Sequence, residues 1–208
     1  MDDYANAFNI AAKELRAKDP AEVGRLSGVE YDAEAGRFRL DFLGRPHLVA
    51  FPEMSVVPAD GRGEAPLPEQ VLVLHYLNQA RGTPLAGELI TYREVPAGEF
   101  YYPAFVKRAE APLVKTFGAS PGLLPRLAPE IGGISLAGHG DGAARFPALP
   151  RAPVTLIVWG GDDEFEPSGR ILFDRSISDY LTTEDVAWLA GLIVYRLMRL
   201  ASRPNQGE

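Results

Sequence analysis

The segment VTLIVWGGDDEFEPSGRILFD, residues 154–174, constrains the fold more than any other part of the chain. It begins and ends with runs of β-branched, aliphatic and aromatic residues, which are typical of strands. Between these runs lie two glycines, a block of carboxylates and Pro167, and such residues interrupt strands and form turns. The pattern predicts strands over 153–159 and 170–174 on either side of an acidic segment.

Alternating apolar and polar residues predict further strands elsewhere. The run VEYDAEAGRFRLDFLGRPHLVAF alternates around two turn signals, and ELITYREV has a similar strand-like composition. We therefore expect an α+β protein, a single domain over residues 1–208, with one antiparallel or mixed sheet packed by three longer helices and several short ones. The strands of this sheet are expected within 29–51, 88–95, 153–159 and 170–174.

Helical spacing of apolar residues predicts the three longer helices, at 4–17, 68–81 and 183–199. The last of them has a capping-box pattern at its start, formed by Thr182 and Asp185.

The helical pattern between residues 101 and 132 is interrupted by prolines, so we expect two or three short helices there. These prolines are Pro112, Pro121, Pro125 and Pro129. An internal loop is expected at 58–68 and a frayed tail at about 202–208. The expected core includes Trp159, Phe173, Leu189, Ile193 and Leu197.

Composition excludes several classes of function. The chain has no cysteine, so it has no disulfide, no thiolate nucleophile and no cysteine ligand for zinc or an iron–sulfur cluster. The formal net charge of −7 argues against nucleic-acid binding, which depends on Lys and Arg neutralising phosphates. A hydrophobic fraction of 46% is typical of a globular protein with a sizeable core.

The sequence also argues against export and membrane insertion. The start MDDYANAF is acidic and lacks the basic start and continuous apolar run of a secretory signal. The apolar run at 186–200 contains Arg196 and Arg199 and is shorter than the roughly 20 residues that a membrane span requires. We expect a cytoplasmic protein that does not contact a membrane.

The motif GASPG, at 118–122, matches the nucleophile elbow G-x-S-x-G of α/β-hydrolases. In that elbow the residue after the serine donates its backbone N–H to the oxyanion. Here the residue after Ser120 is Pro121, which has no N–H. We therefore do not expect a serine hydrolase.

A second glycine-rich motif, GHGDG at 138–142, is a candidate ligand-binding loop. It does not lead into a helix, because Pro147 follows closely, so a phosphate-binding loop is not expected. Glycines allow a ligand to approach the backbone, and the loop carries His139 and Asp141.

The other two histidines have no partner at metal-ligand spacing, which excludes zinc motifs such as H-E-x-x-H. His75 lies within the apolar run VLVLHYL and is expected to be a core histidine hydrogen-bonded to a neighbour. His47 lies in a predicted strand and is expected to be half exposed.

The acidic segment contains Asp162, Asp163, Glu164 and Glu166. If the chain stays extended there, Asp162, Glu164 and Glu166 point to one side and Asp163 to the other. Like charges so close together repel one another unless a cation or arginines neutralise them.

Three interpretations of these carboxylates remain open. They form a solvated turn neutralised by arginines, of which Arg151, Arg170 and Arg175 are nearest in sequence. Alternatively, Asp162, Glu164 and Glu166 bind a hard cation, Mg or Ca. In the third interpretation the carboxylates are catalytic, and Trp159 supplies the apolar shielding that raises the pKa of one of them.

Two long segments, LHYLNQARGTPLAGELITYREVPAGEFYYPAF at 74–105 and LPRAPVTLIVWGGDDEFEPSGRILFDRSISDYLTTED at 149–185, resemble the family DUF3786. The resemblance covers nearly the whole chain. It implies an origin in anaerobic bacteria or archaea, where some members are fused to, or encoded beside, four-cysteine iron–sulfur modules of the kind seen in corrinoid-dependent enzymes. The family supplies no catalytic residues to carry over.

The leading functional hypothesis is a non-enzymatic accessory domain that binds a cofactor or a partner, such as an iron–sulfur or corrinoid protein. Its site is expected where the loop carrying His139 and Asp141 meets the acidic segment after Trp159. The alternatives are a divalent-cation-dependent enzyme using the four carboxylates, with His139 as a base, and a structural subunit of a complex. The sequence does not determine the oligomeric state.

Overall fold

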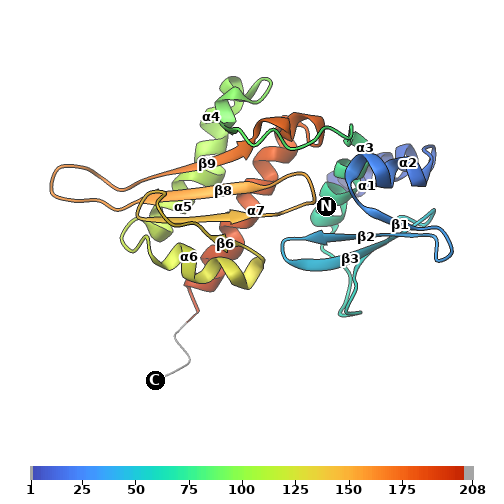
Figure 1. Cartoon of the computed structure of the whole chain (residues 1–208), viewed down its shortest axis with the longest axis horizontal. Coiled ribbons are helices and arrows are strands. Elements are labelled where there is room, and N and C mark those ends of the chain that lie inside the picture. Colours follow the sequence, from blue (N-terminus) through green and yellow to red (C-terminus); the bar gives the residue numbers. More distant parts are fainter. Residues whose placement is uncertain (1, 204–208) are drawn as a thin grey trace.

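The computed structural model describes residues 2–203 (Figure 1). The chain forms two lobes that lie side by side along its long axis, and each lobe has its own antiparallel sheet. The strand order is β1-β2-β3-β4 in the first sheet and β5-β9-β8-β7-β6 in the second. The predicted α+β class is confirmed, but the strands lie in two sheets instead of one.

The first lobe consists of α1 (Asp2–Arg16), α2 (Pro20–Ser27), β1 (Glu30–Asp32), β2 (Arg37–Phe42), β3 (Arg45–Ala50), β4 (Val56–Pro58) and α3 (Leu67–Gln79). Strand β2 shows how the alternating sequence determines the fold, because Phe38, Leu40 and Phe42 are buried and the residues between them are exposed. Helix α1 packs on α3. The helices predicted at 4–17 and 68–81 are confirmed.

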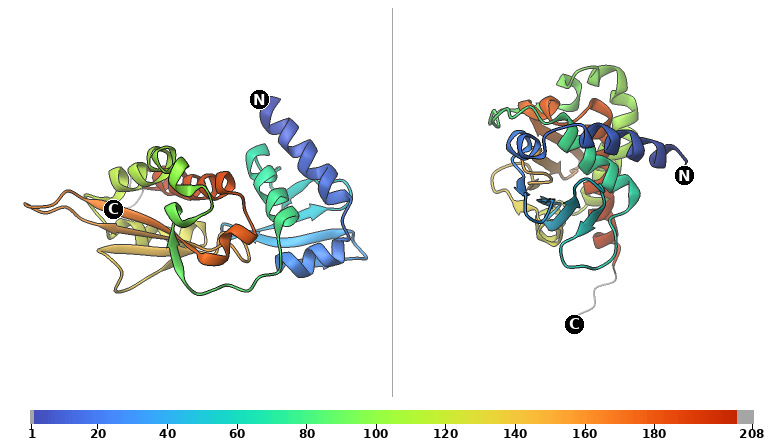
Figure 2. Two further views of the ribbon diagram at one scale, coloured as in Figure 1. Left: turned by 90° about the horizontal axis from the view of Figure 1, so that it is seen from above. Right: turned by 90° about the vertical axis from the view of Figure 1, so that its right-hand side faces the viewer.

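The second lobe begins with β5 (Leu89–Thr91), η1 (Tyr92–Glu94), α4 (Gly98–Phe105), η2 (Val106–Glu110), α5 (Ala111–Phe117), α6 (Leu123–Leu127) and η3 (Ala128–Ile131). It continues with β6 (Ile134–Ser135), β7 (Gly142–Phe146), β8 (Val154–Trp159), β9 (Ser168–Asp174), η4 (Arg175–Asp179) and α7 (Thr183–Ala201). Helices α5, α6 and α7 lie on one side of this sheet (Figure 2). Strand β8 is central in the sheet and buried up to Val158, as its continuous apolar sequence predicts.

Helices α4 and α5 are joined by a π-helical segment, η2, into one continuous helical stretch over residues 98–117. Pro112 therefore does not interrupt this stretch. The remaining helical residues before Gly132 form the short segments α6 and η3, in line with the two or three short helices expected over 101–132. Proline has no N–H to donate, and the helix accommodates it just after a widened turn, in which the N–H of Ala111 bonds to the carbonyl of Val106.

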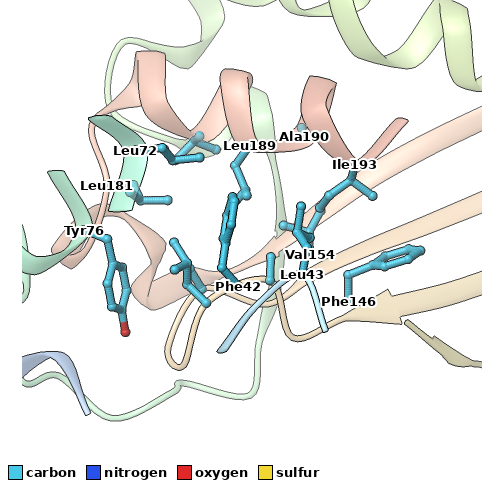
Figure 3. Packing of buried hydrophobic residues seen from close by; sticks show 14 of the residues in the cluster. Phe42, Leu43, Leu72, Tyr76, Phe146, Val154, Leu181, Leu189, Ala190 and Ile193 are labelled. Carbon is cyan, nitrogen blue, oxygen red and sulfur yellow. The ribbon is translucent and has the colours of Figure 1, made fainter. Parts of the chain in front are cut away.

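The two lobes share one cluster of buried hydrophobic side chains. The turn after β2 enters the second lobe, where the N–H of Leu43 donates to the carbonyl of Ala148 at 3.0 Å. Phe42 and Leu43 point among Val154, Leu189 and Ile193 (Figure 3). The core therefore continues from one sheet to the other.

Most of the predicted core residues are buried, namely Phe173, Leu189, Ile193 and Leu197. Trp159 is only partly buried, so its assignment to the core is wrong. It is the last residue of β8 and borders the exposed loop that follows. Most of the predicted tail, residues 204–208, lies outside the described residues. Within residues 2–203, the helices are too short or too polar to span a membrane.

Candidate functional site

The two candidate loops lie next to each other. Strands β7 and β8 are antiparallel, with Gly142 opposite Val158, so the loop before β7 and the loop after β8 emerge at the same end of the sheet. The N–H of Gly160 donates to Oδ2 of Asp141 at 2.8 Å, and the N–H of Asp141 donates to the carbonyl of Val158 at 2.9 Å. Asp141 thus fastens the two loops together.

Two glycines of the GHGDG loop, Gly140 and Gly142, allow close packing of the backbone. Gly140 has a φ of +57°, and a Cβ at this position would lie 2.7 Å from Cγ2 of Ile157. A Cβ on Gly142 would collide with the carbonyl of Pro121. His139 is exposed, and its Nδ1 lies 3.1 Å from the carbonyl oxygen of Ala137. Close packing therefore explains Gly140 and Gly142 without a ligand, whereas a Cβ on Gly138 would meet nothing within 4 Å.

The acidic segment forms the tip of the β8–β9 hairpin, which extends away from the rest of the lobe (Figure 1). Oδ1 of Asp162 accepts hydrogen bonds from the N–H groups of Glu164 (2.8 Å) and Phe165 (2.7 Å). These two hydrogen bonds lower the pKa of Asp162. Its carboxylate therefore organises the turn, while Phe165 is 69% exposed at the tip.

Arginines do not neutralise this turn, contrary to the first interpretation. Arg151 donates to the carbonyl of Gly82 at 2.8 Å, and Arg175 pairs with Glu88 at 2.7 Å. Across residues 2–203, none of the four acidic side chains takes part in an ion pair. The carboxylates are exposed, so water screens their mutual repulsion.

A cation site would need several oxygen ligands around one point. In the part of the chain that the structure describes, no group of three or more His, Asp or Glu side chains is arranged to hold a metal ion. Binding of Mg or Ca by Asp162, Glu164 and Glu166 therefore stays a prediction that the geometry does not strengthen.

The two remaining histidines lie away from these loops. His75 is partly buried and hydrogen-bonded to Asp185, with 2.8 Å between Nδ1 and Oδ1, as expected of a core histidine. His47 is only 3% exposed, so the expectation that it is half exposed is wrong. Its side chain faces the core beside Phe42, with 5.8 Å between the ring centroids. Burial lowers the pKa of His47.

A second candidate site lies along α7. One hollow, of about 500 Å³, lies between α4 and the first turn of α7, and we call it the α4 hollow. Its lining includes Tyr101, Phe105, Arg108, Thr183, Glu184 and Ala187. The other, of about 510 Å³, lies between the start of α1 and α7, and we call it the α1 hollow. Its lining includes Tyr4, Arg108, Glu184, Trp188, Tyr195 and Arg199.

The two hollows share Arg108, Glu184 and Ala187, so they lie next to each other along α7, and we call them together the α7 groove. The groove runs along α7 from Thr182 to Arg199, about 25 Å at 1.5 Å per residue. Figure 2 shows the start of α1 on one side of α7 and the α4 region on the other.

Arg108 lies in the π-helical segment η2 and lines both hollows. A π turn widens the helix locally, and such turns are frequent at functional sites. Helix α7 passes close beneath it, since a Cβ on Gly191 would lie 3.6 Å from the carbonyl oxygen of Arg108. Within residues 2–203, the exposed Arg108 side chain forms neither an ion pair nor a hydrogen bond.

Sequence reasoning did not identify the α7 groove. Its residues come from three segments that are far apart in the chain, and their meeting depends on how the lobes pack. The aromatic run EFYYPAF, at 99–105, lies just before Arg108 and is a local feature of the sequence that could have indicated the groove.

The fold and the groove together define a two-lobed α+β protein with a surface groove lined in part by aromatic side chains. The sequence matches the family model DUF3786, described as a domain of unknown function, over residues 19–196, and the chain belongs to this family. The match includes Arg108, Glu184 and Trp188, whereas Tyr4 and Arg199 lie outside it. Comparison with curated proteins and with solved structures found no match.

Proposed function

We propose that this DUF3786 chain is a non-enzymatic accessory domain that binds a small cofactor in the α7 groove. The observation that carries this proposal is the meeting of two hollows, each of about 500 Å³, at Arg108 and Glu184. Small-molecule sites are usually concave and mostly apolar, with a few polar groups and volumes of about 300–1,000 Å³. Each of the two hollows has a volume within this range, and aromatic side chains line both of them.

Binding fits the chemistry of the groove better than catalysis does. General acid–base catalysis usually relies on a side chain whose pKa its surroundings have moved toward 7. Arg108 and Glu184 are exposed at the groove, and such side chains suit charge pairing with a bound molecule. The family resemblance supports a setting in anaerobic metabolism, beside iron–sulfur or corrinoid proteins.

A divalent-cation-dependent enzyme is the second candidate. The observation that favours it is the hydrogen bond between Gly160 and Asp141, which keeps the loop of His139 beside the acidic turn. In this alternative His139 acts as a base, and the ligands of the ion are Asp162, Glu164 and Glu166.

Recovery of a ligand from the host tests the proposal. Ala187 lines both hollows and is 9% exposed, so Ala187→Trp places a bulky side chain where the two hollows adjoin. Phe165→Ser alters the hairpin tip and serves as the matched control. Each tagged variant, checked by thermal melting, is passed through an anoxic lysate of a host that encodes the protein, and bound small molecules are identified by mass spectrometry.

We expect a molecule that accompanies the wild type and Phe165→Ser but is lost from Ala187→Trp. A molecule retained by Ala187→Trp and lost from Phe165→Ser would contradict the groove and place the site at the hairpin.

A further inference from the structure

We infer that the α7 groove takes a flat aromatic molecule that carries an anionic group, and that Arg108 binds this group. The inference rests on the proposed function and specifies the ligand of the same site. It follows from three properties of the groove: its aromatic walls, the guanidinium of Arg108, which has no ion-pair partner among residues 2–203, and the position of Glu184, a carboxylate that lines both hollows.

Aromatic side chains line both hollows. In the α4 hollow, Tyr101 is 51% exposed and lies beside the buried Phe105. In the α1 hollow, the rings of Tyr4 and Trp188 have centroids 5.1 Å apart, and Tyr195 is 48% exposed. Aromatic rings stack on one another at centroid distances of about 4.5–7 Å and gain more than the burial of their area alone. A planar ring is therefore the occupant that these walls favour.

Arg108 supplies a group at the junction that can bind an anion. The guanidinium of Arg108 is planar and can donate two parallel hydrogen bonds to a carboxylate or phosphate. Its side chain has no ion-pair partner among residues 2–203, so a ligand does not have to displace one. The α1 hollow is also lined by Arg199 and by Asp3, whose opposite charges offset one another, so Arg108 is the group assigned to the anion.

Glu184 limits which anions fit. It lines both hollows. Among the described residues Glu184 forms no ion pair, so its carboxylate oxygens lie more than 4 Å from the charged nitrogen atoms of every basic side chain. A carboxylate repels a second negative charge and accepts hydrogen bonds. The ligand is thus expected to present one anionic group to Arg108 and a hydrogen-bond donor to Glu184.

The two tryptophans of the chain allow a direct test, because Trp188 lies in the groove and Trp159 at the base of the hairpin. The variant Trp159→Phe retains only the groove tryptophan, and Trp188→Phe retains only the hairpin tryptophan. The probes are 1-naphthoate and 1-naphthalenemethanol, which share one ring system and differ in charge. Each is titrated while tryptophan fluorescence is recorded, in both backgrounds.

Arg108→Gln is then made in the Trp159→Phe background, with Arg145→Gln as its control. Arg145 is an exposed arginine on β7, outside the α7 groove. We expect saturable quenching of Trp188 by naphthoate, weakened about fivefold by Arg108→Gln, which corresponds to an exposed charge pair of about 1 kcal/mol. Binding of the alcohol should change less than twofold, and Arg145→Gln should change neither.

Two outcomes overturn the inference. The proposed specificity for anions is wrong if the alcohol binds as tightly as naphthoate, or if Arg108→Gln leaves naphthoate binding unchanged. In either case the groove itself is still a binding site, so the proposed function stands. If neither probe affects Trp188 while the protein is folded by circular dichroism, both the ligand class and the groove as an aromatic site are wrong.

Discussion

Nδ1 of His75 lies 2.8 Å from Oδ1 of Asp185, and this contact joins α3 of the first lobe to the first turn of α7 in the second. The hydrogen bond to Asp185 raises the pKa of His75, although burial acts in the opposite direction. Burial raises the pKa of Asp185, but hydrogen bonds from His75 and Thr182 outweigh this effect and lower it. The negative charges of Glu14 and Glu184 also favour protonated His75.

This contact predicts a pH-dependent stability. The pKa of His75 is higher in the folded state than its unfolded value of about 6.5, so its contribution is complete below that pH and is lost as pH rises through the folded pKa. The pKa of Asp185 is lower in the folded state, so its contribution is present above about pH 4 and is lost as pH falls through the folded pKa.

His75→Gln should therefore lower the free energy of unfolding by about 1 kcal/mol at pH 5.5 and by less at pH 9. Urea unfolding at the two pH values measures this difference. His139→Gln is the control, because His139 is exposed and should show no such pH dependence. An equal loss at both pH values for His75→Gln would show that the ion pair does not form.

The close approach of Gly44 and Gly132 predicts that a side chain at Gly44 destabilises the folded protein where the two lobes meet. Gly44 has a φ of +72°, and a Cβ on it would lie 2.5 Å from Cα of Gly132. Gly61 has a similar φ of +70°, but a Cβ there meets nothing within 4 Å. Gly44→Ala should cost about 3 kcal/mol or more, and Gly61→Ala about 1 kcal/mol. Urea midpoints test this, and equal losses would mean that the contact at Gly44 contributes nothing.

The hydrogen bond from the N–H of Gly160 to Asp141 predicts how fast this amide exchanges with solvent. Asp141→Ala removes the acceptor of the Gly160 N–H, so amide exchange at Gly160 should accelerate, with about 1 kcal/mol or less of global stability lost. Hydrogen exchange followed by NMR measures this effect. Asp163→Ala, a carboxylate of the same hairpin without such a bond, should leave the exchange at Gly160 unchanged.

Divalent cations should not stabilise the protein. Oδ1 of Asp162 already accepts two backbone hydrogen bonds, and in residues 2–203 no group of three potential ligands surrounds one point. A ligand that binds only the folded state raises the melting temperature as its concentration increases. A concentration-dependent rise with Mg, Ca, Mn or Zn, abolished by Asp162→Asn, would support the cation-dependent enzyme instead.

The local elements were predictable because their signals are local. Thr182 and Asp185 form the expected capping box at the start of α7, and its apolar spacing gave the helix nearly its observed length. The strands of the β8–β9 hairpin follow from their composition and from the turn residues between them.

The arrangement of these elements was not predictable in the same way. A strand pattern shows which face is buried, but not which sheet the strand joins, so the two sheets were expected as one. The burial of His47 and the partial exposure of Trp159 depend on packing against distant segments. Arg108 carries no sequence signal of its own, because its position depends on the π turn and on the path of α7.

The indole N–H signals of the two tryptophans give the most direct test of the α7 groove. In proton–nitrogen NMR spectra of the wild-type chain titrated with 1-naphthoate, we predict a saturable shift of the Trp188 signal and a constant Trp159 signal. A shift of the Trp159 signal with an unchanged Trp188 signal would contradict the groove as the binding site.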